Sequence, residues 1–293
     1  MTVAETIAEG VERLRACGVA EERAAARILL GRVLGLDRAQ LLIRSKEPIS
    51  KPHHLEYISL IDRRASGEPL QYITGHQEFY GLDFIVTPDV LIPRPETEFL
   101  TERIINLAAG IEAPLIVDVG TGSGCIAVTV AKHVPAARLM AIDISAAALG
   151  VAHQNAKRYD VTDRIEFLEG DLLAPISNRV CNLGVDIIAS NPPYVPESKV
   201  DAVQREVREW EPRVALFGGP EGLDFFGRLL EDSPAALKLG GYLVCEIGFS
   251  QLDAVRAMID PGVWLSHDLI CDLQGIPRIL TLQRGHEPPI STG

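Results

Sequence analysis

The chain has 293 residues, of which 47% are hydrophobic and 23% are charged, and its formal net charge is −12. This length fits one large or two modest domains, and the composition is that of an ordinary globular protein. No apolar run approaches the roughly 20 residues that a membrane-spanning helix needs, so we expect no membrane contact.

The charge is unevenly distributed. Residues 1–80 carry 11 basic and 11 acidic side chains, whereas residues 81–293 carry 17 basic and 29 acidic ones. Because phosphate contacts from Lys and Arg supply most non-specific affinity for nucleic acid, the acidic excess argues against direct nucleic-acid binding. Glutamates near the N-terminus occupy positions where an export signal needs basic and apolar residues, so we expect a cytoplasmic protein. The five cysteines are scattered along the chain, so we expect reduced thiols. Neither they nor the seven histidines have the spacing of metal ligands, so we expect no metal site.

Residues 1–75 predict a small helical domain. Apolar residues such as Ile7, Val11 and Leu14 recur at helical spacing, and glycine or proline separates the segments. The alternative is that these helices only decorate a second domain. Residues 76–93 predict a β-hairpin linker, because two short apolar runs flank Gly81. Pro95, followed by acidic residues, is typical of a first helical turn.

Residues 94–284 predict an α/β domain. Strands are expected at 115–119, 138–142, 165–168, 185–189, 242–247, 264–270 and 278–282, and helices at 125–133, 146–159, 222–237 and 252–259. Such alternation predicts a mostly parallel sheet with helices on both faces. Residues 285–293 are expected to form a flexible tail.

A glycine-rich turn follows the first of these strands. It comprises Gly120, Thr121, Gly122, Ser123 and Gly124. Closely spaced glycines let a ligand approach the backbone. A dinucleotide fingerprint needs a third glycine at the position of Cys125, and a phosphate-binding loop needs a lysine that is absent. The spacing therefore predicts a nucleoside ligand without a pyrophosphate.

Two acidic residues follow the next two strands. Asp143 can accept hydrogen bonds from both ribose hydroxyls, and Asp171 can accept one from an adenine amine while Leu172 packs on the ring. Taken alone, either acid is equally typical of a helix cap or a solvated loop. Their register with the glycine turn favours the binding interpretation.

The tetrapeptide Asn191-Pro192-Pro193-Tyr194 follows the strand 185–189. Ligands bind at the carboxyl ends of strands in open α/β sheets. The two prolines restrict the backbone, so the Asn191 side-chain oxygen and the Pro192 carbonyl can form a rigid pair of neutral acceptors. Such acceptors suit a planar NH2 group, either an amide or a base amine. Tyr194 can form a wall of this site, and the alternative for it is a core aromatic.

These motifs, in this order, resemble those of class I S-adenosylmethionine-dependent methyltransferases, which have a Rossmann-like, mostly parallel seven-stranded sheet. A more specific resemblance is to the bacterial peptide chain release factor N5-glutamine methyltransferases, the PrmC/HemK family. It covers about residues 65–282, and the motifs that carry it are Pro69-Leu-Gln71-Tyr72-Ile-Thr-Gly75, Phe79-Tyr80-Gly81, Leu91-Ile92-Pro93-Arg94-Pro95-Glu96-Thr97-Glu98, residues 117–124, Glu211-Pro212-Arg213, residues 215–219, Glu246-Ile247-Gly248 and residues 272–278.

The resemblance implies an enzyme that methylates the N5 amide of the glutamine in the Gly-Gly-Gln motif of release factors, with S-adenosylhomocysteine as the second product. It implies that residues 120–124, Asp143 and Leu172 contact the cofactor, next to Asn191, and that residues 191–194 hold the glutamine amide. The family often has an aromatic residue where this chain has Leu172. Arg94 and Glu96 belong to a family segment near the active site, the helical domain would recognise the release factor, and we expect a monomer.

Two other functions are compatible with parts of this pattern. Adenine-N6 nucleic-acid methyltransferases share an Asn-Pro-Pro-Tyr motif, but a basic face would be expected of them. A non-catalytic module that binds S-adenosylmethionine would be expected to lose Asp143 or Asn191, and both residues are present.

Overall fold

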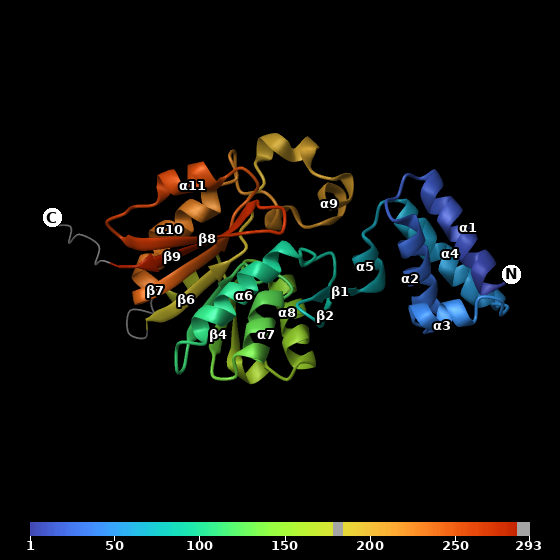
Figure 1. Ribbon diagram of the computed structural model, residues 1–293, viewed down its shortest axis with the longest axis horizontal. Helices are drawn as coiled ribbons and strands as arrows, with labels where there is room; N and C mark the ends of the chain where they lie inside the picture. Colours follow the sequence, from blue (N-terminus) through green and yellow to red (C-terminus); the bar gives the residue numbers. More distant parts are fainter. Residues whose placement is uncertain (178–183, 286–293) are drawn as a thin grey trace. The chain divides into compact units, whose positions relative to one another are not determined.

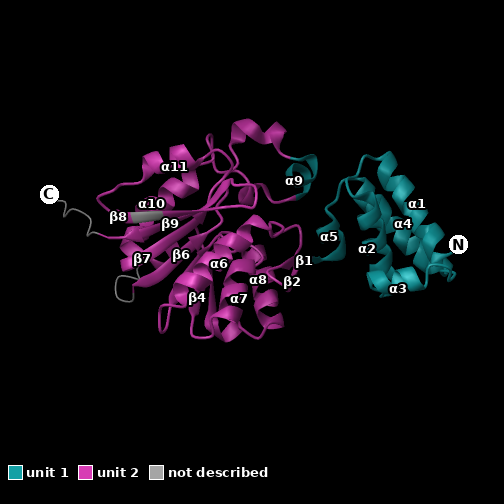
Figure 2. Ribbon diagram, viewed as in Figure 1, with its two compact units in different colours: residues 1–76, 204–210 teal, residues 77–203, 211–293 magenta. Residues whose placement is uncertain are grey.

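The computed structural model describes residues 1–177 and 184–285. It contains two compact units: the first comprises residues 1–76 and 204–210, and the second comprises the other described residues (Figures 1 and 2). Cys181 and residues 286–293, most of the expected tail, lie outside the described residues. Within the described ranges, no helix has the length and apolar character needed to cross a membrane.

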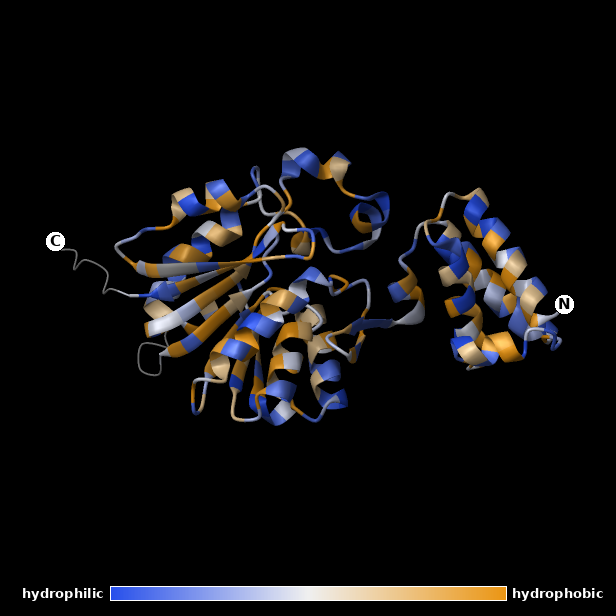
Figure 3. Ribbon diagram, in the orientation of Figure 1, coloured by the Kyte–Doolittle hydropathy of each residue, from blue (hydrophilic) through white to orange (hydrophobic). Residues whose placement is uncertain are grey.

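The first unit is a helical bundle. Its helices are α1 (Val3–Ala16), α2 (Glu22–Leu34), α3 (Arg38–Ile43), α4 (Lys51–Ala65), α5 (Leu70–Thr74) and α9 (Arg205–Trp210). The apolar stripes visible in Figure 3 form a core whose fully buried members include Leu14, Leu29 and Tyr57. A capping box at Thr2 begins α1, and the Ser50 hydroxyl caps α4. The predicted N-terminal helical bundle is confirmed.

Helix α9 joins this bundle from much later in the chain. The buried Arg64 side chain of α4 binds Glu206 of α9, with 2.7 Å between Nη2 and Oε2. Arg64 also donates to the backbone carbonyl of Glu68 at 2.8 Å. The predicted catalytic range 94–284 contains this segment, and no periodicity in the sequence indicates that it packs on the first unit. The bounds of the four predicted segments, 1–75, 76–93, 94–284 and 285–293, stay a prediction.

A two-stranded hairpin, β1 (His76–Phe79) and β2 (Leu82–Ile85), comes next in the chain. Its turn residues Tyr80 and Gly81 both have positive φ, 52° and 74°, as a tight two-residue hairpin turn requires. Phe79 and Phe84 are buried and meet edge to face, with ring centroids 6.0 Å apart.

A seven-stranded sheet forms the centre of the second unit. Its order is β5 (Ile165–Glu169), β4 (Arg138–Asp143), β3 (Leu115–Val119), β6 (Val185–Ser190), β7 (Leu237–Glu246), β9 (Pro277–Arg284) and β8 (Trp264–Cys271). Strands β3 to β7 pair in parallel, and β9 runs antiparallel to both of its neighbours. The predicted mostly parallel seven-stranded fold is confirmed. The carboxyl ends of β3, β4, β5 and β6 therefore meet at one edge.

Helices cover both faces of the sheet. One buried cluster contains residues of α6 (Glu96–Ala108), α7 (Cys125–His133) and α8 (Ala146–Arg158). The other contains residues of α10 (Asp224–Ala236) and α11 (Leu252–Met258). Within β3, Ile116 belongs to the first cluster and its neighbour Val117 to the second, as the alternation of side chains along a strand requires.

Strand β7 begins at Leu237, five residues before the predicted start at residue 242. The strand includes Gly240 and Gly241 and continues through them. A side chain on Gly241 would lie within 3.1 Å of three backbone carbonyl oxygens, those of Lys238, Asp186 and Val185. Glycine therefore permits the close approach of β6 here, where the register between the two strands also shifts.

Candidate active site

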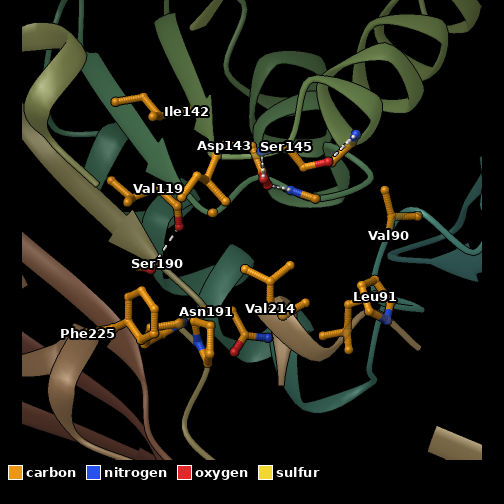
Figure 4. Close-up of a pocket in the computed structure, with 18 of the residues that line it drawn as sticks. Val90, Leu91, Val119, Ile142, Asp143, Ser145, Ser190, Asn191, Val214 and Phe225 are labelled. Carbon is orange, nitrogen blue, oxygen red and sulfur yellow. Dashed lines mark hydrogen bonds between the residues drawn. The ribbon is translucent and has the colours of Figure 1, made fainter. Parts of the chain in front are cut away.

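A pocket opens at the carboxyl ends of β3 to β6 (Figure 4). Its walls also include residues 89–91 and residues 212, 214 and 215. Phe225 of α10 lies at one side of it. In Figure 4, Asp143 lies on one side of the pocket and Asn191 on the other. The pocket thus brings together residues from strands that are far apart in the sequence, at the edge where open α/β sheets bind ligands.

The glycine turn forms one wall. Of its five residues, Gly120 and Gly122 line the pocket with φ values of 74° and 55°, which other residues rarely adopt. Gly124 packs against α8, where an added Cβ would lie 3.0 Å from the Ala152 Cβ. The hydroxyl of Thr121 donates to Asp118 at 2.7 Å, and Ser123 is buried. Two turn residues therefore face the pocket, and the other three support the turn.

Asp143 ends β4 beside this turn and lines the pocket. Its carboxylate accepts from the backbone N–H groups of Gly122 and Ser145, each at 2.9 Å. Burial raises the pKa of Asp143, and the two backbone donors partly offset that rise. Each carboxylate oxygen has a further lone pair, so Asp143 can accept hydrogen bonds from ligand hydroxyls.

Asp118 is a buried carboxyl in β3, and in the sequence it belongs to the motif at residues 117–124. Burial raises its pKa to about 7. Oδ2 accepts from Thr121 at 2.7 Å and from the backbone N–H of Ala127 at 3.2 Å, whereas Oδ1 is buried with no partner among the described residues. A cationic ligand group nearby would stabilise its ionised form.

Asp171 and Leu172 line the pocket beyond the end of β5. Both oxygens of Asp171 are bound by Arg228, with Nη2–Oδ2 at 2.6 Å and Nη1–Oδ1 at 3.2 Å, and the two side chains are about half exposed. Leu172 is buried with a φ of 47°, an uncommon value for a non-glycine residue. Asp171 therefore has a protein partner as well as a place at the pocket.

Asn191, Pro192 and Pro193 form the opposite wall. The preceding Ser190 ends β6, and its hydroxyl donates to the Val119 carbonyl at 2.8 Å, which ties the ends of β6 and β3 together (Figure 4). The Asn191 Nδ2 group donates to the Thr97 hydroxyl at 3.0 Å.

Tyr194 extends the same segment toward the protein interior. Its hydroxyl donates to Glu246 Oε1 at 3.2 Å, and its carbonyl accepts from Gln251 Nε2 at 3.0 Å. Burial raises the pKa of its phenol. Within the described residues, Tyr194 is not among those that line the pocket. Its expected contact with a substrate stays a prediction.

An ion pair joins two of the pocket's outer segments. Arg94 Nη2 lies 2.6 Å from Glu211 Oε1, and the backbone N–H of Ile92 donates to Glu211 Oε2 at 3.2 Å. Glu211 is buried. The segments at 89–94 and 211–215 are thereby held together across 117 residues of sequence. Both partners lie in motifs that the sequence shows, residues 91–98 and 211–213, but neither motif indicates that the two side chains pair.

Glu246 is a second buried carboxyl near the site, and its pKa is raised to about 7 by burial. The unfolded carboxyl has a pKa of about 4.5, so the folded protein holds more protons between pH 4.5 and 7. The free energy of unfolding should therefore fall as the pH rises through this window. We expect Glu246→Gln to make that fall shallower in denaturant titrations at a series of pH values.

The matched control for this prediction is Glu102→Gln, which replaces an exposed acid on α6. The control should leave the pH dependence of unfolding unchanged. Equal slopes in wild type and Glu246→Gln would contradict the assignment of this ionisation to Glu246.

Comparison with known proteins gives two family matches. The model described as PrmC N-terminal domain matches residues 5–75, and the model described as Methyltransferase small domain matches residues 96–210. The first match lies within the described residues, and the second includes residues 178–183, which lie outside them.

Two full-length relatives carry the same name, release factor glutamine methyltransferase. The one from Koribacter versatilis is 42% identical over 280 residues, which cover 96% of this chain and 98% of the relative. The one from Moorella thermoacetica is 42% identical over 288 residues, which cover 98% of this chain and all of the relative. A solved methyltransferase from Pyrococcus furiosus shares the fold at 18% identity, with a TM-score of 0.50 over 71% of this chain and 91% of that one.

Proposed function

The chain belongs to the release factor glutamine methyltransferase family, and from this premise we propose that it methylates the N5 amide of the glutamine in the Gly-Gly-Gln motif of peptide chain release factors. S-adenosylmethionine would be the methyl donor and S-adenosylhomocysteine the second product. The observation that supports this function is that Asp143, Gly120 and Gly122 line one pocket together with Asn191 and Pro192.

The pocket residues fit this cofactor. Gly120 and Gly122 expose backbone to the ligand, and Asp143 offers carboxylate oxygens for ribose hydroxyls. Asp118 is buried and is not among the described residues that line the pocket, but its Oδ1 has no partner among them, which suits a positive charge nearby. When bound, S-adenosylmethionine supplies a methyl group on a positively charged sulfur. We propose residues 120–124, Asp143, Asp171, Leu172 and Asn191 as the cofactor site.

To catalyse this transfer, the protein must orient a weak nucleophile, the amide nitrogen of the substrate glutamine. The lone pair of an amide nitrogen is delocalised into its carbonyl, so the nitrogen must be held in line with the electrophile. The Asn191 Oδ1 and the Pro192 carbonyl would accept hydrogen bonds from the NH2 hydrogens. These acceptors would also stabilise the positive charge that develops on nitrogen. A strong base is not required before transfer, because the N–H becomes acidic once the nitrogen has gained a methyl group.

We also propose how the release factor is recognised and which oligomeric state the protein has. The helical unit would recognise the body of the release factor, and the protein would act as a monomer. An adenine-N6 nucleic-acid methyltransferase is the less favoured alternative, because residues 81–293 carry 29 acidic against 17 basic side chains.

Mass spectrometry of a release factor incubated with this protein and isotope-labelled S-adenosylmethionine tests the function. We expect one added methyl group on the glutamine of the Gly-Gly-Gln motif, and none on a release factor in which that glutamine is replaced by alanine. Transfer to an adenine-containing oligonucleotide in place of the release factor would contradict the proposal.

A further inference from the structure

A chain of two hydrogen bonds, the first partly and the second fully buried, leads from Asn191 away from the pocket. The Asn191 Nδ2 group donates to Thr97 Oγ1 at 3.0 Å, and the Thr97 hydroxyl donates to Glu246 Oε2 at 2.7 Å. Thr97 lies in the first turn of α6 and Glu246 at the end of β7, and both are almost fully buried. Three elements that are distant in sequence therefore converge behind the Asn191 side chain.

The direction of each bond follows from the chemistry of the groups. A threonine hydroxyl has one proton to donate, and an ionised carboxylate can only accept. In its ionised form, Glu246 therefore accepts the hydrogen bond from the Thr97 hydroxyl, which leaves the Thr97 oxygen to accept from the Asn191 N–H group. The other Glu246 oxygen accepts from the Tyr194 hydroxyl at 3.2 Å, so both carboxylate oxygens have donors.

This arrangement distinguishes the two ends of the Asn191 carboxamide. Its nitrogen is engaged by Thr97, and in the described part of the chain its oxygen takes part in no hydrogen bond. Rotation of the amide by half a turn would place Oδ1 against the Thr97 oxygen and present an NH2 group to the substrate. An NH2 group cannot accept a hydrogen bond from the NH2 group of glutamine.

We propose that Thr97 and Glu246 are positioning residues, which hold the Asn191 carboxamide with Oδ1 available to the substrate amide; this inference rests on the proposed function. Neither residue lines the pocket in the described structure, so each acts through Asn191. A side chain held in one orientation by buried neighbours is what efficient transfer to a weak nucleophile requires.

Thr101 provides a comparison on the same helix. It is fully buried one turn beyond Thr97, but its hydroxyl donates to a backbone carbonyl of its own helix, that of Thr97, at 3.2 Å. A purely structural role for a buried hydroxyl in α6 would therefore affect Thr97 and Thr101 similarly. A positioning role would separate them.

The test compares Thr97→Val, Thr97→Ser and Thr101→Val in the full-length protein. Valine keeps the shape of threonine without the hydroxyl, whereas serine keeps the hydroxyl. For methylation of a release factor we expect Thr97→Val to lower kcat about tenfold or more, because the acceptor is no longer fixed. Thr97→Ser should recover most of the rate, and Thr101→Val should stay near wild type. Calorimetry should give the same S-adenosylhomocysteine affinity for all of these variants.

Near-wild-type kcat for Thr97→Val would overturn the inference. An equal loss of kcat in Thr97→Val and Thr101→Val would also overturn it, because equal losses indicate that each variant acts by destabilising α6. Denaturant unfolding of each variant shows how much stability is lost. If the wild-type protein does not methylate the release factor, the proposed function itself is contradicted. If the wild type is active and Thr97→Val is equally active, only the positioning role is contradicted.

Discussion

Asn191→Ala is expected to lower kcat for release factor methylation by about 100-fold or more, because removal of one positioned acceptor at a reacting centre has effects of this size. Asn191 stands at the end of β6 between the pocket and Thr97. Alanine removes the oxygen that would accept from the substrate NH2 group, and no side chain replaces it. Steady-state kinetics with a release factor measures the loss.

Cofactor affinity is the control for this prediction. Asn191 also belongs to the proposed cofactor site, but the polar groups of Asp143 and the glycine turn stay in place in the variant. We therefore expect S-adenosylhomocysteine to bind Asn191→Ala nearly as well as it binds wild type. Turnover close to that of wild type would refute the role given to Asn191.

Asp143→Ala is expected to weaken cofactor binding by about 1.5–3 kcal/mol, the usual value of a hydrogen bond to a charged group. This corresponds to roughly a 10- to 150-fold rise in Kd. The carboxylate lies at the end of β4 in the pocket, where partial burial strengthens its bonds. Calorimetric titration with S-adenosylhomocysteine measures the change.

Asp171→Ala is the matched control, since it removes another carboxylate from the same pocket. Asp171 is about half exposed and already paired with Arg228, so its loss should weaken binding less. Asp143→Asn keeps one oxygen acceptor and should give an intermediate Kd. An unchanged Kd for Asp143→Ala would show that the cofactor does not use this carboxylate.

Local patterns in the sequence account well for the elements that build the pocket. Strand β3 and helix α7 have the predicted bounds, because Pro114 and Gly124 mark their beginnings and apolar runs fill them. Parallel strands bring their carboxyl ends to one edge, so motifs in chain order could be placed at a single site. Gly120, Asp143 and Asn191 do line one pocket.

Hydrogen bonds and ion pairs between residues far apart in the chain could not be predicted from the sequence. The bond between Thr97 and Glu246 spans 149 residues, and that between Arg94 and Glu211 spans 117. No periodicity or spacing in the sequence indicates either pair, because a hydrogen bond depends on where the fold places its two groups and not on their separation in the chain. The packing of α9 on the first unit is of the same kind. Tyr194 is an example: the sequence shows its position in the motif, but not that its hydroxyl donates a hydrogen bond to Glu246.

In the proposed mechanism, the acceptors of Asn191 and Pro192 hold the substrate amide against the methyl donor. A crystal structure of the protein with S-adenosylhomocysteine and a glutamine-containing release factor fragment tests it most directly. We expect the glutamine side-chain nitrogen to lie within about 2.6–3.2 Å of both the Asn191 Oδ1 and the Pro192 carbonyl oxygen, and to face the cofactor sulfur. A glutamine amide bound elsewhere, or an Asn191 side chain turned with its NH2 group toward the substrate, would contradict it.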